Sequence, residues 1–301
     1  MQTQPIDFHP PAEEAAAFLL PVTTRLFSDR ADRFAVLADG HSLGDWLNFL
    51  GQLSRAQQAA QKALPELALP DAAALEQAQT HGMPPLDPAV RPAAWRDTLR
   101  QIAKAMSDDA PEALRASLSS LAASSDEALE KLADMLLSGE PQAEQAAALP
   151  FVAAALQVVF SELASRLPNG QLQAIDVHGV CPCCGSLPVA SVVRLGAAIN
   201  NLRYLHCSLC NTEWNLARAT CTACETEKSV ALHEVEGSKG AVRAETCDDC
   251  KSYLKIVYQE KDPLVDPVAD DLATLALDML VDEAGYSRSG PNLFLIGANA
   301  S

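Results

Sequence analysis

The chain has 301 residues and a net charge of −17, from 22 Lys or Arg residues against 39 Asp or Glu residues. No stretch is basic, which argues against a protein that holds nucleic acid through its phosphates. The first residues lack the basic region and cleavage site of a secretory signal, and the longest apolar run, residues 146–160, is too short to cross a bilayer. We therefore expect a cytoplasmic protein that binds no nucleic acid and does not insert into a membrane.

The first half of the chain predicts an all-α domain, because Ala and Leu dominate it and its apolar residues recur at helical spacing. Helices are predicted over residues 23–38, 42–64, 71–80, 93–106, 111–122, 125–138 and 142–166, with a proline-rich loop, HGMPPLDP, over 81–88. Ser42 with Asp45, and Ser124 with Glu127, match the capping box, in which two side chains three residues apart bond each other's backbone N–H groups. No catalytic signature accompanies these helices.

Strand-like segments replace the helices after Gly170, because β-branched and aromatic residues become frequent there. Strands are predicted over residues 186–194, 202–207, 213–219, 229–236, 242–246 and 253–259. A single helix is then predicted over 269–285. Asp270 and Asp271 favour its N-terminus, and we interpret them, with Asp278, as capping and solvent-facing residues rather than as carboxylates with a chemical role.

Eight cysteines form four C-x-x-C pairs, and the last two pairs repeat the first two at a distance of 40 residues, which indicates an internal duplication. The paired cysteines are Cys181, Cys184, Cys207, Cys210, Cys221, Cys224, Cys247 and Cys250. Each pair lies at an end of a strand-like segment, where a tight turn directs two sulfur atoms at one point. Two such turns complete a tetrahedron that suits zinc or a single iron. We therefore predict that all eight cysteines are metal ligands, with one ion in each four-cysteine site.

The two pairs of one repeat are predicted to share a site, because the 22 residues between them have room for a β-hairpin. A cross-braced arrangement, which joins the first pair with the third and the second with the fourth, stays open. Gly185 and Asn211, which follow the first two pairs, suit the left-handed backbone of such turns. Glu225 and Lys251 suit it less, so we expect the second site to be looser.

These elements predict an α+β protein of several domains: an all-α helical domain over residues 1–172, a first four-cysteine module over 173–219, and a second module over 220–301 that includes the C-terminal helix. Both modules are expected to be rubredoxin-like or zinc-ribbon-like β modules in tandem. Disulfide-linked hairpins and thioredoxin-like redox chemistry fit less well, because no export signal is present and a redox C-x-x-C opens a helix.

Several other residues near the pairs are interpreted without a metal role. Cys183, the ninth cysteine, is expected to be a bystander thiol. His206, His178 and His233 are predicted to be surface residues of the β region rather than ligands. Trp214 is expected to pack over the first metal module.

With these residues in view, the chain resembles the FdhE family, the accessory proteins of formate dehydrogenase maturation. The resemblance is carried by the segments CPCCGSLPVAS, RYLHCSLCNTEW, ETCDDCKSYLKI, KDPLVDPVADDLATLALD and GYSRSGPNLFL, and more weakly by SLGDWLNF and GMPPLD. It extends over most of the chain. The family's metal-site cysteines correspond to the eight paired cysteines, and none corresponds to Cys183.

The resemblance implies a cytoplasmic factor that is not an enzyme and that binds the catalytic subunit of formate dehydrogenase before export. It also implies rubredoxin-type iron, so two iron ions are preferred over zinc as the cofactor. An iron–thiolate electron-transfer protein that acts on the same client is the alternative function. A zinc-ribbon protein that binds nucleic acid is a third, and the acidic charge argues against it.

Overall fold

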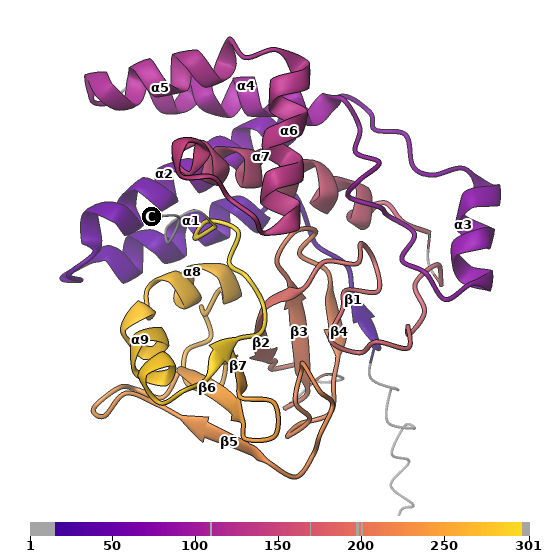
Figure 1. Ribbon diagram of the computed structural model, residues 1–301, viewed down its shortest axis with the longest axis vertical. Coiled ribbons are helices and arrows are strands. Elements are labelled where there is room, and N and C mark those ends of the chain that lie inside the picture. Colours follow the sequence, from indigo (N-terminus) through magenta and orange to yellow (C-terminus); the bar gives the residue numbers. More distant parts are fainter. Residues whose placement is uncertain (1–15, 109, 169, 197–198, 200, 297–301) are drawn as a thin grey trace, which may run out of the picture.

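The computed structural model describes residues 16–108, 110–168, 170–196, 199 and 201–296. Helices from the first half of the chain occupy one side of the molecule, and a sheet built mainly from the second half occupies the other (Figure 1). The predicted α+β class, with a helical part followed by a β part that carries the cysteines, is confirmed. None of the described helices is long and apolar enough to cross a membrane.

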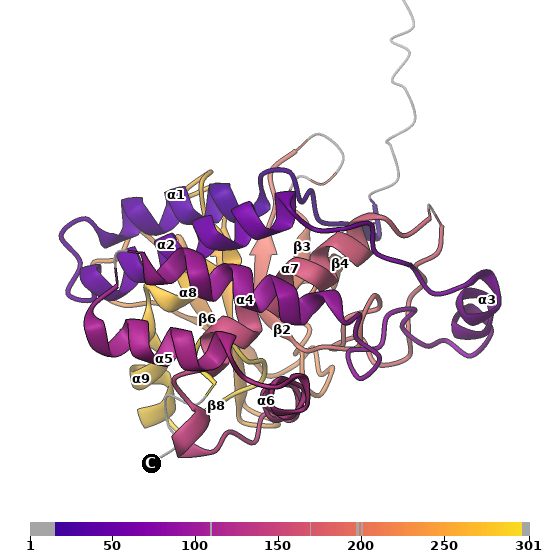
Figure 2. The same ribbon diagram turned by 90° about the horizontal axis from the view of Figure 1, so that it is seen from above.

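Several helices of the first half pack against α7 (Leu149–Ser165), which is buried on almost every side. The helical elements are α1 (Leu26–Ala38), α2 (Gly44–Lys62), α3 (Ala72–Thr80), α4 (Ala94–Ser107), α5 (Glu112–Ala122), α6 (Asp126–Ser138), the short 3-10 helix Ala143–Gln145 and α7 (Leu149–Ser165). The fully buried Ala153, Ala154 and Ala155 of α7 allow its neighbours to approach closely. Figure 2 shows α1, α2, α4 and α5 side by side in front of the sheet, while α3 stands apart from them.

Helix starts differ in detail from the predicted ones. The last helix of this part begins at Leu149 rather than at residue 142, because Pro150 has no backbone N–H and fits only the first turn of a helix. Neither predicted capping box forms. The second helix begins after Leu43 without a side-chain cap, and Ser125 rather than Ser124 caps α6. Ser125 has the extended backbone of an N-cap residue, which turns its hydroxyl toward the free N–H groups of the first turn.

An eight-stranded sheet brings the two cysteine repeats together. Its strands are β1 (Phe18–Leu19), β2 (Pro188–Val193), β3 (Arg203–Cys207), β4 (Glu213–Asn215), β5 (Val230–His233), β6 (Val242–Cys247), β7 (Ser252–Tyr258) and β8 (Ser287–Arg288). The strand order is β1-β4-β3-β2-β7-β6-β5, and β8 pairs with β7. Each predicted strand segment overlaps one of β2 to β7, so these predictions are confirmed, with bounds that are shorter for β2 to β5, one residue longer for β6 and shifted by one residue for β7.

A parallel pair of strands joins the repeats inside this sheet. Strand β2 of the first repeat lies beside β7 of the second, with Ser191 opposite Ile256 and Val193 opposite Tyr258. Both strands are almost wholly buried, as is usual for strands that are covered on both faces. The two four-cysteine modules are therefore halves of one sheet.

The C-terminal segment contains two short helices, α8 (Pro267–Leu272) and α9 (Leu275–Glu283), so the prediction of a single helix here is wrong. Between them the backbone bonds span three residues, from Thr274 N–H to the Asp271 carbonyl (3.3 Å) and from Leu277 N–H to the Thr274 carbonyl (3.0 Å). Lys255 Nζ donates to the same two carbonyl oxygens at 2.8 and 3.0 Å. In a continuous α-helix each of these carbonyl groups would instead accept from the N–H four residues later.

The interpretation of Asp270 and Asp271 as solvent-facing residues is also wrong, although Asp270 does bond the start of the helix, where its carboxylate accepts a hydrogen bond from the Asp266 N–H (2.8 Å). Asp270 and Asp271 are 2% and 0% exposed. The Asp270 carboxylate accepts hydrogen bonds from Arg33 of α1 at 2.5 and 2.9 Å, and Asp271 pairs with Lys255 at 3.3 Å. A buried carboxylate needs a cation or a hydrogen-bond donor beside it. The local sequence around α8 could not show these partners, because they lie far from it along the chain.

Asp266 is the residue that caps α8, since its Oδ1 accepts hydrogen bonds from the first free N–H groups of the helix at 3.0 and 2.8 Å. Asp278 of α9 is not a free surface carboxylate either. It accepts a hydrogen bond from the Tyr253 hydroxyl (2.8 Å) and pairs with Arg288 (3.2 Å). The acidic residues of this segment therefore fasten it to two neighbours: Asp270 to α1, and Asp271 and Asp278 to the sheet.

Candidate metal centres

The eight paired cysteines gather in two clusters, one from each repeat. In each cluster the four sulfur atoms lie within 4.8 Å of one another. The first cluster contains Cys181, Cys184, Cys207 and Cys210, and the second contains Cys221, Cys224, Cys247 and Cys250. The tandem arrangement is therefore the one that the structure contains, and the cross-braced arrangement is not.

Antiparallel pairing within each repeat explains the clusters. The first C-x-x-C turn directly precedes β2 and the second follows β3, and the register places Pro188 opposite Cys207. In the second repeat the register places Val230 opposite Cys247 in the same way. Because the strands of each hairpin are antiparallel, the two C-x-x-C turns lie at the same end and face each other. The hairpin alone therefore brings the four sulfur atoms of a site together.

The spacing of the sulfur atoms fits a four-coordinate metal ion. With metal–sulfur bonds of about 2.3 Å, a regular tetrahedron has sulfur–sulfur edges of about 3.8 Å. The distances across the pairs are 3.6 Å for Cys181 with Cys210, 3.5 Å for Cys184 with Cys207, 3.6 Å for Cys221 with Cys250 and 3.7 Å for Cys224 with Cys247. All nine cysteines are free, so disulfide-linked hairpins are not what the structure contains. Four thiolate donors at this spacing suit zinc and iron alike.

The residue after each C-x-x-C pair adopts a left-handed backbone. The φ angles are 75° at Gly185, 57° at Asn211, 62° at Glu225 and 55° at Lys251. This was expected for Gly185 and Asn211, and the structure extends it to the two charged residues, which adopt this conformation less readily. All four turns thus share one backbone geometry.

The helical part of the chain closes the first site, whose four cysteines are all buried. From α7, the Gln157 side chain donates a hydrogen bond to the carbonyl oxygen of Ser208 (2.8 Å), and Ser161 accepts one from the Asn211 amide (2.8 Å). From the proline-rich loop, the Leu86 N–H donates to the carbonyl oxygen of Cys183 (3.0 Å). Two segments distant in sequence therefore cover the turns of this site.

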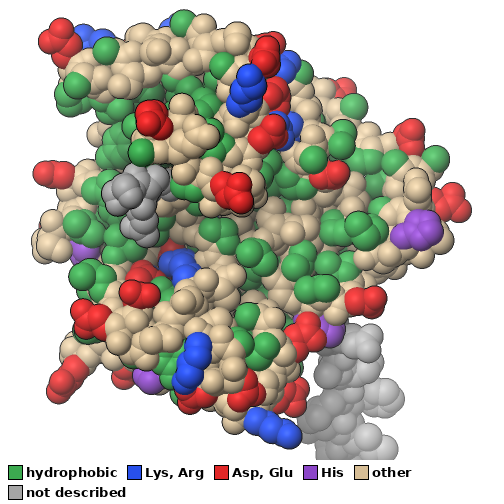
Figure 3. All heavy atoms as spheres, in the orientation of Figure 1, with side chains coloured by type: hydrophobic (Ala, Val, Ile, Leu, Met, Phe, Trp, Pro, Cys, Tyr) green, Lys and Arg blue, Asp and Glu red, His purple; other side chains and the backbone are tan. Residues whose placement is uncertain are grey.

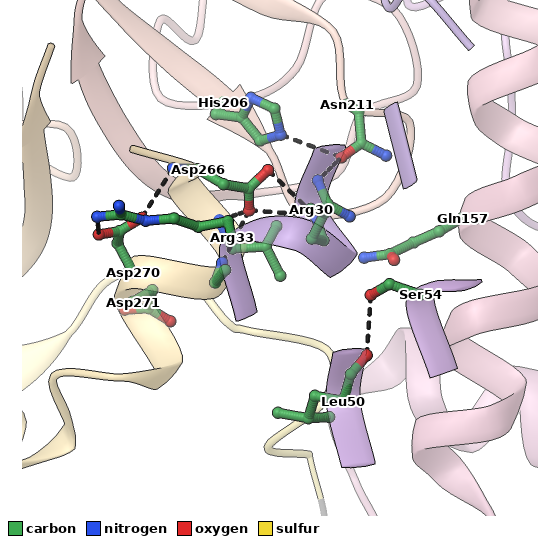
Figure 4. A network of polar contacts seen from close by, with 12 residues as sticks. Arg30, Arg33, Leu50, Ser54, Gln157, His206, Asn211, Asp266, Asp270 and Asp271 are labelled. Atoms are coloured by element: carbon green, nitrogen blue, oxygen red, sulfur yellow. Dashed lines mark hydrogen bonds and ion pairs between the residues drawn. The ribbon is translucent and has the colours of Figure 1, made fainter. Parts of the chain in front are cut away.

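A buried polar network continues from the first site into α1 (Figure 4). The Asn211 side-chain oxygen accepts hydrogen bonds from Arg30 Nη2 (2.8 Å) and from His206 Nε2 (3.0 Å). Arg30 Nε also donates to Asp266 at 3.1 and 3.2 Å. This network joins the second turn of the first site to both α1 and the start of α8.

His206 is a buried member of this network, so its prediction as a surface residue is wrong. It is 4% exposed, and its Nδ1 contacts Glu213 Oε1 at 2.8 Å. The Glu213 carboxylate also pairs with Arg194. Burial alone would raise the pKa of Glu213, but the charge of Arg194 and the hydrogen bond with His206 outweigh it and lower the pKa to about 2.

The second site is more open than the first. Cys221 and Cys247 are buried, whereas Cys224 and Cys250 are exposed. Ser252 Oγ lies 2.9 Å from the sulfur of Cys250 and is its nearest hydroxyl partner. The expectation of a looser second site agrees with this exposure.

The remaining predicted residues lie outside both sulfur clusters. Cys183 is buried but is not one of the clustered sulfur atoms, as expected of a bystander. His178 faces Glu225 (Nδ1 to Oε2, 3.1 Å), and His233 contacts the Thr246 hydroxyl (3.0 Å). Trp214 belongs to the same large hydrophobic core as the cysteines of the first site, and its indole N–H donates a hydrogen bond to the His178 carbonyl oxygen (2.8 Å).

Arg30 is the residue near the site that sequence reasoning missed, although a signal for it was present. It lies three residues after Phe27 and four before Phe34, on the apolar face of the helix that these residues define. A cation on such a face needs a buried partner. That partner, Asp266, is 236 positions away in the sequence.

Comparison with known proteins places the whole chain in one family. Models of the N-terminal, central and C-terminal domains of FdhE match residues 15–176, 180–218 and 219–295, respectively. The FdhE homolog of Edwardsiella ictaluri is 44% identical over 283 residues, which cover 93% of this chain and 91% of the relative. The homolog of Serratia proteamaculans is 41% identical over 290 residues, with 94% and 92% covered.

A solved structure agrees with these relatives. The crystal structure of the FdhE protein from Pseudomonas aeruginosa matches with a TM-score of 0.84 and 38% sequence identity, and the match covers 93% of this chain and 98% of that one. Family models, related sequences and three-dimensional structure thus lead to the same result, and the chain belongs to the FdhE family.

Proposed function

We propose that this protein is an accessory factor in the maturation of formate dehydrogenase. It acts in the cytoplasm, binds the catalytic subunit of that enzyme and catalyses no reaction itself. The observation that carries the proposal is the match of FdhE models along the chain, together with two complete four-cysteine clusters. Its acidic net charge of −17 supports a protein client rather than nucleic acid.

Each cluster is proposed to hold one metal ion, with all eight paired cysteines as ligands and iron preferred over zinc. Iron supplies a one-electron couple that zinc lacks. Around it the chain provides sulfur donors and hydrogen bonds that stabilise their charge: the N–H groups of Leu209 and Cys210 both donate to the sulfur of Cys207 at 3.4 Å. Metal analysis and an absorption spectrum of protein purified without air distinguish the two metals.

An electron-transfer role toward the same client is the alternative, and it requires iron. Its test is complementation by protein that contains only zinc. Full restoration of formate dehydrogenase activity by such protein excludes electron transfer and leaves the binding role intact.

We also propose the division into a helical domain (residues 1–172), a first metal module (173–219) and a second metal module (220–301). The last helix before the sheet, α7, ends at Ser165, and β2 begins at Pro188, which supports the first boundary. The second boundary separates the repeats along the chain, although β2 and β7 pair across it.

A groove beside the first metal site supports client binding. It has a volume of about 1000 Å³ and lies between the loop after α3, the end of α6 and the first C-x-x-C turn. Its walls include Met83, Leu137 and Val177, and Figure 3 shows hydrophobic side chains gathered in the middle of this face. Among its described lining residues, the carboxylates are Asp87 and Asp176, and no Lys or Arg is present. Such a groove suits an apolar client segment that carries a basic residue.

Two matched valine variants test this role. Val177→Asp changes a groove residue that is 58% exposed, and Val36→Asp changes a residue of α1 that is 60% exposed. Because both side chains face solvent, both variants are expected to fold. In cells that lack the native protein, Val177→Asp is expected to reduce both formate dehydrogenase activity and copurification of the catalytic subunit, and Val36→Asp is expected to restore both. If both variants restore formate dehydrogenase activity equally, the groove is not the client-binding surface. If cells without the protein keep full formate dehydrogenase activity, the proposed function is wrong.

A further inference from the structure

The duplicated cysteine repeat allows each residue of the first site to be compared with its counterpart 40 positions later. The outer cysteines, which are the second member of each pair, differ most. Cys184 and Cys210 are 1% and 0% exposed, whereas their counterparts Cys224 and Cys250 lie on the surface. The inner cysteines of both repeats are buried. The two sites therefore share a backbone geometry but differ in access from solvent.

The helical part of the chain causes this difference. In the first site, Ser208 and Asn211 accept or donate hydrogen bonds with α7, and Arg30 of α1 also bonds Asn211. Pro84 Cγ lies 3.7 Å from the position that a β-carbon on Gly185 would occupy. These contacts leave Cys184 and Cys210 almost without exposed surface, although Cys184 also lines the wall of the groove beside the first site.

The counterparts of these covered residues form an exposed surface around the second site. Asp248, Lys251, Ala223 and Glu225 stand where the first repeat has Ser208, Asn211, Cys183 and Gly185. All four are exposed. Two of the charged side chains pair with each other at the surface, Lys251 Nζ with Asp248 Oδ1 (2.6 Å). Three of these four residues are charged, and charged side chains favour contact with water. Among the described residues, no helix covers the turns of the second site as α7 covers those of the first.

A second difference concerns the surroundings of the sulfur atoms. The cysteines of the first site belong to the large hydrophobic core, whereas those of the second site belong to none of the hydrophobic clusters of the described residues. A hydroxyl beside the last sulfur is common to both repeats, since Ser252 Oγ lies 2.9 Å from Cys250 Sγ and its counterpart Thr212 Oγ1 lies 3.2 Å from Cys210 Sγ, so the difference between the surroundings is the hydrophobic core alone. The second site can therefore release an outer ligand without disturbing the core.

We infer that the second site is an exchangeable site for a thiophilic divalent cation, with Cys224 and Cys250 as its exchanging ligands, and that the first site retains its ion. Exchange proceeds by ligand substitution: an incoming thiolate or chelator bonds the metal, an outer cysteine leaves as thiolate and takes a proton from water, and no electron is transferred. Cys221 and Cys247 hold the ion meanwhile. The inference rests on the proposal that both clusters bind metal.

The test measures metal release from the full chain loaded with zinc. After addition of a chromophoric chelator, one ion is expected to leave at least about tenfold faster than the other, since access of solvent controls the exchange of a bound metal. Iodoacetamide labelling followed by mass spectrometry is expected to modify Cys224 and Cys250 well before Cys184 and Cys210. Equal release rates, or earlier labelling of the first site, would overturn the inference. A starting content below two ions per chain would instead count against the proposed metal function.

Two variants identify the cause of fast release. Cys224→Ser with Cys250→Ser is expected to abolish the fast phase and to keep the slow one. Glu225→Gly with Lys251→Asn places residues suited to the left-handed turns in the second repeat while both thiolates stay exposed. The fast phase is expected to persist in this variant. If it disappears, turn strain rather than exposure controls release, and the inference is wrong.

Discussion

Arg30 offers the most direct measure of how strongly the helical part is fastened to the first metal site. Its guanidinium is fully buried, bonds Asp266 at 3.1 and 3.2 Å and bonds the Asn211 side chain at 2.8 Å. Arg30→Met keeps a side chain of similar length but removes these bonds. Removal of one partner of a buried ion pair costs about 3–5 kcal/mol, because the other charge stays buried without compensation.

The lower end of this range is expected here. Asp266 keeps two backbone N–H bonds at the start of α8, and Arg30 Nη1 has no hydrogen-bond partner among the described residues. We therefore expect Arg30→Met to lower the free energy of unfolding of the metal-loaded protein by about 3 kcal/mol. Urea denaturation followed by circular dichroism measures the change.

Arg55→Met is the matched control. Arg55 pairs with Asp32 at 3.1 Å on the surface, where the two side chains are 60% and 70% exposed. Loss of an exposed pair costs less than about 1 kcal/mol. A similarly small loss in Arg30→Met would refute the reasoning, because it would mean that the buried contacts of Arg30 do not hold α1, α8 and the first site together.

Two further predictions concern the first site. Because the pKa of Glu213 is lowered from its ordinary 4.5 to about 2, its charge stabilises the fold above pH 4.5, and this stability is lost as pH falls toward 2. Glu213→Gln should therefore be less stable than the unchanged protein by about 3 kcal/mol at pH 7 and by little at pH 2–3, as measured by urea denaturation; a constant difference would contradict this. Cys181→Ala with Cys184→Ala should lose one metal ion per chain and the maturation activity, whereas Cys183→Ala should keep both; unchanged metal content in the double variant would refute the ligand assignment.

The sequence alone determined the elements that depend on near neighbours. Apolar periodicity predicted the helices, and β-branched and aromatic residues predicted the strands. The four C-x-x-C pairs predicted both sulfur clusters, and the room for a hairpin within each repeat favoured the tandem arrangement over the cross-braced one. The turns after Cys184 and Cys210 were also predicted, because Gly185 and Asn211 suit a left-handed backbone. Each of these features is decided by residues within one hairpin or one helix, so a local pattern is sufficient.

Only the tertiary structure decided which polar residues are buried and which metal site is covered. His206, Asp270 and Asp271 resemble surface residues in their local pattern, but their partners lie in other elements, such as Arg33 of α1, 237 positions from Asp270. The parallel pairing of β2 with β7 likewise joins strands from different repeats. The two cysteine sites are alike in spacing and turn geometry, and they differ because α1, α7 and the proline-rich loop pack on the first and not on the second. Burial depends on which distant segments pack beside a residue, and the sequence of the repeat does not contain that information.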